Sequence, residues 1–428
     1  MFYHIYTFSL ARVPFENDYS ETGHKLSEIA GWIPHIKEIG CNAVLLSPAL
    51  KSRTHGYDVT DYFCIDNRIG TNEEFRELVD SFHSNGIRVV LDSVFNHCGR
   101  DFFAFRELSG GNRDYASWFS GVDFSRESPL GDPFTYDTWS GYYELVKFNL
   151  YNEDVCNYLL DAAQFWIGRF DIDGMRLDSA NVLDHSFMRR LRLATSGKKP
   201  DFWLMGEVVA GDYSIWVNPG LLHSVTNYII YKSLFSSHNN NNIFELANCL
   251  EQAVPNYGFS LYNFLDNHDQ PRIASNVSDP AFLNTLYCLL FTLPGIPSVY
   301  YGSEWGITGQ KENGSDDPLR PYIDVSNPPA DPCGLAGFIR KLAEIRRDNG
   351  PLKYGGYRQV QLAYHKPFIF ERFLDGDRVF IAVNIGGDTE YIDLSVNCDL
   401  VDLLSGQRYG SAGIRIAPHS SMILIPAN

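Results

Sequence analysis

The chain has 428 residues, with 35 Lys or Arg against 52 Asp or Glu, so its formal net charge is −17. This acidic balance argues against nucleic acid or an anionic membrane surface as the main partner, and it suits a neutral substrate. The length allows one large domain with smaller satellites. No stretch of the sequence approaches the roughly 18 consecutive apolar residues of a membrane span.

The amino-terminal residues predict a strand rather than a targeting segment. The sequence MFYHIYTF has no basic region followed by an apolar run and a small-residue cleavage site. We therefore expect a cytoplasmic protein whose first domain begins almost at Met1.

Short apolar runs that predict strands alternate with amphipathic stretches that predict helices up to about Gly350. The predicted strands are 3–8, 43–47, 87–92, 174–178, 202–207, 224–228, 261–266 and 298–301, of which the sixth has the weakest pattern. The predicted helices are 24–39, 71–85, 155–170, 184–194 and 280–293. Eight such repeats are typical of an α/β fold of the (β/α)₈ barrel type, whose active site lies at the carboxyl ends of the strands.

Two segments depart from this alternation and predict separate domains. Residues 98–152 are rich in aromatic and turn residues and predict a loop-rich inserted domain without a clear helix, after the third strand. Alternating runs at 368–374 and 377–383, joined by an Asp-Gly turn, predict a hairpin in a carboxyl-terminal antiparallel β-sandwich. The predicted boundaries are therefore 1–97 with 153–353 for the barrel, 98–152 for the inserted domain and 354–428 for the carboxyl-terminal domain.

Several of the predicted barrel strands end in acidic or histidine side chains. A buried unpaired carboxylate costs several kcal/mol, so structural need alone does not explain this pattern. Since the carboxyl ends of barrel strands meet at one face, the simplest interpretation is a shared active site. The segments are Asp92 to His97, Arg176 with Asp178, Glu207, and Asp266 to Asp269.

The carboxylates in these segments differ in their expected environments. Arg176 and Asp178 are two positions apart on a strand and point the same way, so the guanidinium should keep Asp178 ionised, as a nucleophile requires. Glu207 follows the apolar run FWLMG, where burial would favour the protonated acid. A lone carboxylate would more often be a helix cap or a rim salt bridge. The combination with Asp269 and His268 favours catalysis.

With these motifs the sequence resembles the α-amylase family, glycoside hydrolase family 13, over essentially the whole chain. Its four short family regions correspond to DSVFNH, GMRLDSA, GE and FLDNHD, preceded by GYDVTDY. The resemblance implies that Asp178 is the nucleophile, Glu207 the general acid/base and Asp269 the transition-state stabiliser of a retaining hydrolase.

The resemblance also implies a set of sugar-binding residues. His97, Arg176 and His268 would bind the sugar in the cleavage subsite, and Tyr57 would be its stacking platform. The loop that ends at Arg320 matches one whose arginine touches a distal sugar, although a salt bridge within the loop explains it equally well.

Two aromatic residues of the inserted segment, Trp139 and Tyr142, are the ones we most expect to face sugar. Half of the aromatic residues in that segment are expected to pack in its own core instead.

Departures from the family pattern narrow the subtype. Secreted members often follow the nucleophile with a Lys-His pair that helps to bind calcium, whereas this chain has Asn181-Val182 at that place. We therefore predict no metal site and no cofactor. A structural calcium is still compatible with Asn96, which the family pattern also contains. VKFN at Val146–Asn149 resembles a motif of cyclomaltodextrinases and neopullulanases, but the amino-terminal domain of that subgroup is not expected here. Thr54 replaces an aspartate typical of exo-acting α-glucosidases.

We therefore predict a retaining hydrolase of α-1,4-linked glucans, acting on maltodextrins or starch-type oligosaccharides. The alternatives are a transglycosylase or an α-glucosidase of the same family, and a non-catalytic relative that binds sugar. The third is disfavoured because all three catalytic carboxylates are present. The expected partner is an oligosaccharide rather than nucleic acid or a membrane, and the sequence allows a homo-oligomer.

Overall fold

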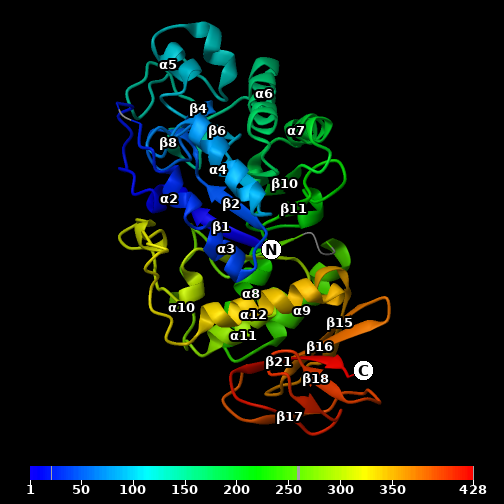
Figure 1. Cartoon of the computed structure of the whole chain (residues 1–428). Helices are drawn as coiled ribbons and strands as arrows, with labels where there is room; N and C mark the ends of the chain where they lie inside the picture. Colours follow the sequence, from blue (N-terminus) through cyan, green and yellow to red (C-terminus); the bar gives the residue numbers. More distant parts are fainter. Residues whose placement is uncertain (21, 258–260, 428) are drawn as a thin grey trace.

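The computed structural model describes residues 1–20, 22–257 and 261–427, and within them a parallel sheet of eight strands forms a barrel (Figure 1). Its spatial order is β11-β10-β9-β5-β2-β1-β13-β12, and a parallel bridge between Thr226 and Tyr262 joins β11 to β12. The predicted (β/α)₈ barrel is therefore confirmed. The strands are β1 (Phe2–Tyr6), β2 (Ala43–Ser47), β5 (Arg88–Ser93), β9 (Gly174–Leu177), β10 (Trp203–Gly206), β11 (Ser224–Val225), β12 (Tyr262–Asn263) and β13 (Ile296–Tyr300).

Helices surround the barrel, and four of the described α-helices, α4, α6, α7 and α8, begin at a side-chain cap. The clearest is at Thr71, whose hydroxyl accepts a hydrogen bond from the Glu74 amide (3.2 Å) while the Glu74 carboxylate accepts one from the Thr71 amide (2.8 Å).

No helix in the described parts of the chain is both long and apolar enough to span a membrane. The α-helices are α1 (Thr7–Leu10), α2 (Leu26–Ala30), α3 (Ile33–Ile39), α4 (Asn72–Ser84), α6 (Glu153–Phe170), α7 (His185–Lys198), α8 (Tyr228–Asn239), α9 (Phe244–Tyr257), α10 (Ile273–Asn276), α11 (Phe282–Thr292), α12 (Leu335–Asp348) and α13 (Gly350–Tyr354). Short 3₁₀ helices are η2 (Ala180–Val182), η3 (Tyr213–Ile215), η4 (Ser303–Trp305) and η5 (Asp317–Leu319).

Two predicted elements near the amino terminus differ from the structure. The first strand ends at Tyr6 rather than residue 8, because the chain turns there into α1. The predicted helix 24–39 is two helices, α2 and α3, which break at Gly31. Pro34 in the first turn of α3 lacks the amide that a continuous helix would use, so a new helix begins there.

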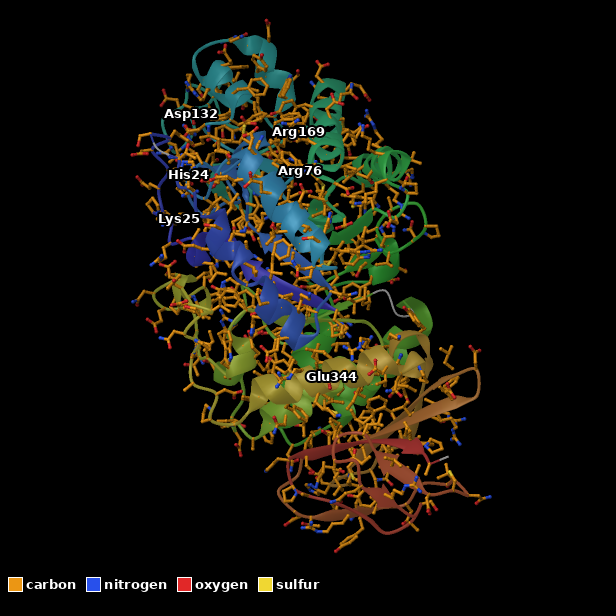
Figure 2. The ribbon with its side chains drawn as sticks, viewed as in Figure 1. His24, Lys25, Arg76, Asp132, Arg169 and Glu344 are labelled. Carbon is orange, nitrogen blue, oxygen red and sulfur yellow. The ribbon has the colours of Figure 1, made fainter. Side chains whose placement is uncertain are left out.

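The inserted segment contains more regular structure than its sequence predicts. The expectation of no helix is wrong, because α5 (Phe103–Ser109) buries Ala104, Phe105 and Leu108, and the 3₁₀ helix η1 (Arg113–Trp118) follows. The strands β6 (His97–Gly99), β8 (Tyr142–Lys147) and β7 (Thr138–Trp139) form a small antiparallel sheet. The loop is also held by Arg100, which donates twice to Asp132, labelled in Figure 2, at 2.8 Å.

A further hairpin, which the sequence did not predict, follows β2. It consists of β3 (Leu50–Ser52) and β4 (Val59–Ile65), and its connecting loop carries Tyr57. A buried ion pair between Arg68 and Asp66 (2.9 Å) lies just beyond β4 and fixes the start of the next connection.

The carboxyl-terminal β domain packs against α11 and α13, at the opposite end of the molecule from the inserted segment (Figure 1). In its main sheet Phe368 and Phe370 belong to the hydrophobic core of the barrel, whereas Ile369 faces the small second sheet. This alternation follows from the period of two along a strand, and it buries both faces of β15 at these residues. The main sheet is β14 (Gly356–Gln361), β15 (Phe368–Leu374), β16 (Asp377–Asn384), β21 (Ser420–Pro426), β18 (Leu400–Asp402) and β19 (Arg408–Tyr409), and the second is β17 (Glu390–Ile392) with β20 (Ile414–Ile416).

Two buried arginines, one from the barrel and one from this domain, converge on backbone carbonyls at the end of α11. Arg346 of α12 donates to the carbonyls of Phe291 (2.7 Å) and Gly295 (2.6 Å), at the turn between α11 and β13. Arg372 of β15 donates to the Thr292 carbonyl (2.6 Å) in the same turn. Burial lowers the pKa of Arg346 to about 10 and that of Arg372 to about 9. These guanidiniums therefore hold the turn in place at a cost in desolvation.

Replacing Arg346 with Ala should destabilise the protein by about 3 kcal/mol, because several buried carbonyls lose their donor. The neighbouring Arg347 is exposed and paired with Asp348 (3.0 Å), so Arg347→Ala is a matched control that should change stability little. Urea denaturation of the two variants measures the difference. Equal stability of the two variants would show that the Arg346 contacts do not hold the turn after α11.

Candidate active site

The strand register of the barrel brings the predicted catalytic residues together. Asp92 of β5 pairs with Arg176 of β9, and Gly206 of β10 pairs with Leu177. Asp178 and Glu207 each follow the last residue of their strand, and their amides donate to the Ser93 carbonyl and the Leu177 carbonyl, both at 2.9 Å. The two carboxylates therefore leave adjacent strands at the same level.

One buried guanidinium lies at the centre of this group. Arg176 places one terminal nitrogen, Nη1, 2.9 Å from Asp92 and 3.0 Å from Asp178, and the other, Nη2, 3.0 Å from Glu207. Its side chain is 4% exposed. Three carboxylates around one cation leave the cluster with an excess of negative charge in a region of low dielectric constant.

That excess appears in the protonation of Asp178. Burial raises the pKa of Asp178 to about 8; the Arg176 guanidinium opposes the rise, and the neighbouring Glu207 and Asp92 carboxylates add to it. The expectation that Arg176 by itself keeps Asp178 ionised is therefore wrong for the unliganded site. Burial outweighs the ion pair because the same cation also serves two other carboxylates.

Ser179 joins the two principal carboxylates and was not predicted from the sequence. Its amide donates to Glu207 (3.0 Å) and its hydroxyl donates to Asp178 (3.1 Å). Its backbone has φ +48°, a left-handed conformation that is costly for a residue with a Cβ. No sequence pattern signals a left-handed serine, so only the fold reveals this contact.

Asp269 has a different environment from Asp178. Its carboxylate lies 2.9 Å from Arg320 Nη2 and 3.0 Å from His268 Nε2. Burial alone would raise the pKa of Asp269, but His268, Arg320 and Arg176 hold it well below its ordinary value. Asp269 is therefore ionised in the unliganded site.

Arg320 contacts protein rather than open space in the unliganded site. Besides Asp269, it donates to the His268 carbonyl (2.8 Å), the Tyr6 hydroxyl (3.2 Å) and Asp316 (3.1 Å). The sequence left a salt bridge and a sugar contact as equal interpretations, and the observed contacts include the salt bridge.

Tyr57 links the two halves of the site. Its hydroxyl donates to Asp92 (3.0 Å) and lies 2.5 Å from His268 Nε2, and its ring is stacked on that of His268 with an interplanar angle of 6°. Arg176 lies 5.9 Å from the centre of the same ring. The structure thus brings Tyr57, His268 and the carboxylate cluster into direct contact.

A row of rings leads outward from His97. The rings of His97 and Trp139 are 5.9 Å apart, and Trp139 is stacked on Tyr142 at 5.8 Å with an interplanar angle of 23°. His97 is 1% exposed and Tyr142 is 60% exposed, so the row runs from the floor of the site to solvent.

His97 presents an unused hydrogen-bonding atom. Burial, and secondarily the nearby His55, lower the pKa of His97 to about 3, so the ring is neutral at ordinary pH. The Asn96 amide nitrogen lies 3.2 Å from Nδ1, which leaves the ring proton on Nε2. The Tyr57 backbone lies near the ring and opposes the fall in its pKa, but Nε2 makes no hydrogen bond of full geometry within the described residues. A buried donor without a partner is unusual and indicates a position for a ligand atom.

The residues at the family's calcium position, Asn96 and the Asn181-Val182 pair, include no carboxylate. Asn181 and Val182 lie in η2, and the amide nitrogen of Asn96 faces His97. Over residues 1–20, 22–257 and 261–427, no group of three or more His, Cys, Asp and Glu side chains is arranged to hold a metal ion.

Comparison with known proteins identifies the family. Residues 14–322 match the model of the α-amylase catalytic domain. The cyclomaltodextrinase of Thermoanaerobacter pseudethanolicus is 32% identical over 420 residues, which cover 94% of this chain and 71% of that protein. The intracellular maltogenic amylase of Bacillus subtilis is 31% identical over 397 residues, which cover 89% of this chain and 65% of that protein.

A solved structure matches the fold over the full length. The ligand-free cyclic α-maltosyl-(1→6)-maltose hydrolase of Arthrobacter globiformis superimposes with a TM-score of 0.86 at 28% identity, covering 100% of this chain and 98% of that one. The chain belongs to the α-amylase family of glycoside hydrolases, as its motifs predict.

The raised pKa of Asp178 predicts a pH-dependent stability. Because the folded state keeps this carboxyl protonated up to about pH 8 while the unfolded chain releases the proton near its ordinary value of 3.8, stability falls as pH rises between these values. Asp178→Asn removes this penalty, so it should raise the melting temperature more at pH 7.5 than at pH 5. Thermal unfolding at both pH values measures this, and a pH-independent difference would contradict it.

Proposed function

We propose that this chain hydrolyses α-1,4-linked glucans with retention of configuration, through a covalent glycosyl-enzyme on Asp178. The observation that carries the proposal is the attachment of Asp178 and Glu207 to the two terminal nitrogens of one buried guanidinium. Retaining glycosidases need two carboxyl groups about 5–5.5 Å apart, one as nucleophile and one as acid and then base. A shared guanidinium favours such a short separation.

The mechanism requires the proton of this pair to lie on Glu207 at the moment of attack. Since Asp178 and Glu207 are held by the same cation, a proton retained by burial belongs to the pair rather than to one carboxyl. Attack on the anomeric carbon requires the state in which Glu207 carries the proton and Asp178 is ionised. Glu207 then protonates the leaving oxygen, and after departure of the aglycone it takes a proton from the incoming water.

Asp269 is proposed to stabilise the transition state. Its depressed pKa keeps the carboxylate charged, and a fixed charge helps only where positive charge develops on the sugar. Arg320 is proposed to position Asp269 and His268 through its hydrogen bonds rather than to bind sugar directly.

The remaining residues form the proposed sugar-binding surface. Tyr57 would stack on the sugar at the cleavage position, and the free Nε2 of His97 would donate to one of its hydroxyls, with His268 beside them. Trp139 and Tyr142 would support sugar units farther along the chain.

The proposed substrates are maltodextrins, in accordance with the names of the cyclomaltodextrinase and maltogenic amylase relatives. The latter is named as intracellular, which supports a cytoplasmic location for this chain. We also propose that the barrel, the inserted domain and the carboxyl-terminal domain divide at residues 98, 153 and 354. Longer oligomers formed from maltotriose would indicate transglycosylation instead of hydrolysis.

Variants of the two carboxylates test the mechanism. Asp178→Asn should lower turnover by at least about 10²-fold on every substrate, because the nucleophile is lost. Glu207→Gln should be equally impaired on maltodextrins but retain the first step on an aryl glycoside whose leaving group needs no proton. A fluoro-sugar inactivator should label Asp178, and more than a tenth of wild-type activity in Asp178→Asn would refute its role.

Trp139→Ala should raise KM more than it lowers kcat on maltoheptaose, because a platform away from the reacting bond contributes mostly uniform binding. Tyr151, which is 83% exposed and lies outside the row of rings, provides the control variant Tyr151→Ala. Steady-state kinetics of both variants on maltoheptaose measure the changes in KM and kcat. A fall in kcat with unchanged KM would place Trp139 in the chemical step instead.

A further inference from the structure

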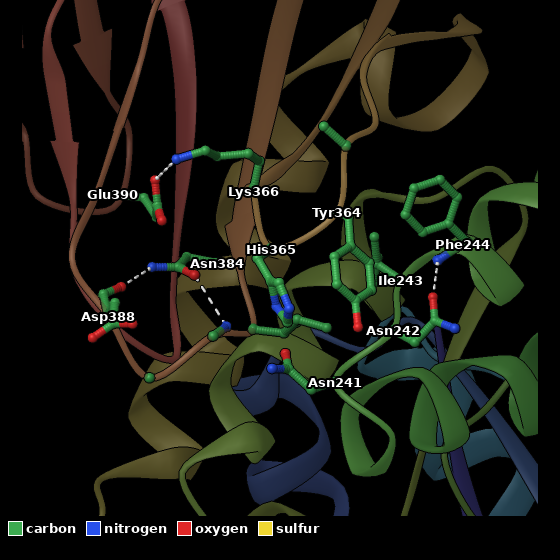
Figure 3. Close-up of a pocket in the computed structure, with 14 residues that line it drawn as sticks. Asn241, Asn242, Ile243, Phe244, Tyr364, His365, Lys366, Asn384, Asp388 and Glu390 are labelled. Carbon is green, nitrogen blue, oxygen red and sulfur yellow. Dashed lines mark hydrogen bonds and ion pairs between the residues drawn. The ribbon is translucent and has the colours of Figure 1, made fainter.

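A cavity of about 400 Å³ lies where the barrel meets the carboxyl-terminal domain (Figure 3). One wall is the loop between α8 and α9, residues 241–244, and the other comes from residues 363–366 and 384–388 with Glu390. Small-molecule sites occupy roughly 300–1,000 Å³, so the cavity can accept a short oligosaccharide segment.

This pocket is separate from the candidate active site. The α8 helix begins at Tyr228, whose hydroxyl accepts a hydrogen bond from Asn267 beside the catalytic residues (3.3 Å), and it ends at Asn239 next to the pocket. At 1.5 Å per residue its 12 residues span about 18 Å. None of the residues that line the pocket belongs to the proposed catalytic or sugar-binding set.

Exposed aromatic rings line the pocket. Tyr364 is 69% exposed and Phe244 is 39% exposed, and Figure 3 shows both rings on the same side of the cavity. The His365 ring lies against Tyr364 with 3.9 Å between ring centres, and the left-handed backbone of His365 (φ +54°) holds this turn. A large ring left in water beside a recess is available for stacking on a flat, partly apolar ligand.

The polar groups of the pocket suit hydroxyl groups rather than an anion. The side-chain oxygen of Asn242 accepts a hydrogen bond from the Phe244 backbone amide (3.1 Å), which leaves the side-chain NH₂ group of Asn242 available. Asn241 lines the same wall. The Lys366 ammonium is already paired with Glu390 (2.8 Å), and Asp388 adds another carboxylate. Amide donors, carboxylate acceptors and stacking rings together are complementary to a neutral sugar.

We infer that this pocket is a second glucan-binding site, which holds a segment of an α-1,4-glucan on the protein away from the catalytic residues. The inference rests on the proposed function for the identity of the sugar, since the pocket chemistry alone specifies only a neutral saccharide. Such a site raises the local concentration of polymer at the enzyme. It should therefore affect long substrates and leave short ones unchanged.

The test compares Tyr364→Ala with Tyr354→Ala, a matched control, because Tyr354 is also 69% exposed but lies in α13 outside the pocket. Tyr364→Ala should raise KM for soluble starch about three- to tenfold, the loss expected for one stacking ring, while kcat/KM for maltotriose stays within about twofold. Tyr354→Ala should change neither.

Retardation of the protein in native gels that contain amylopectin provides a readout without catalysis. Tyr364→Ala should migrate faster than wild type and Tyr354→Ala should not. If Tyr364→Ala matches the control in both the starch KM and the gel, the pocket does not bind glucan. If wild type cleaves no glucan, the proposed function fails, whereas gel retardation that depends on Tyr364 would still support the second site.

Discussion

The site depends on one buried cation, Arg176, and on the strand register that places three carboxylates around it. Asp92, Asp178 and Glu207 come from three neighbouring strands, and each lies within about one hydrogen-bond length of the same guanidinium. Without the cation, burying three carboxyl groups so close together would be costlier still, because nothing would offset their mutual repulsion. Without the register, the guanidinium could not reach all three. Fold and chemistry are therefore coupled through a single side chain.

The barrel, the carboxyl-terminal β domain and the clustering of the acidic strand ends could be predicted from the sequence, because each rests on a local pattern. Apolar runs mark buried strands, and charges just beyond them must lie at one face of a parallel barrel. The sixth strand, which has the weakest pattern, and the seventh, which was predicted over 261–266, are each only two residues long, since their neighbouring residues leave the sheet at once.

Contacts between distant segments could not be predicted, because no local pattern encodes them. Ser179 joins Asp178 to Glu207 only because its backbone adopts a left-handed conformation at the end of β9. The pKa of Asp178 depends on its burial and on how many carboxylates share one guanidinium, and both are properties of the assembled site. Likewise, α5 is a short helix that tertiary packing of Phe105 and Leu108 stabilises, and isolated helices of this length are unstable.

The alternating burial of β15 gives the carboxyl-terminal domain a role in the integrity of the barrel. Phe368 and Phe370 fill the same hydrophobic cluster as the helices around the barrel, while Ile369 fills the small core on the far side of the sheet. At β15 the sheet thus separates two hydrophobic clusters and is buried on both faces, whereas its edge strands β14 and β19 are partly exposed. Domains that share one continuous core unfold together, so the catalytic barrel and this sheet should behave as one cooperative unit. Truncation at the junction would expose an aggregation-prone hydrophobic surface instead of releasing an independently folded domain.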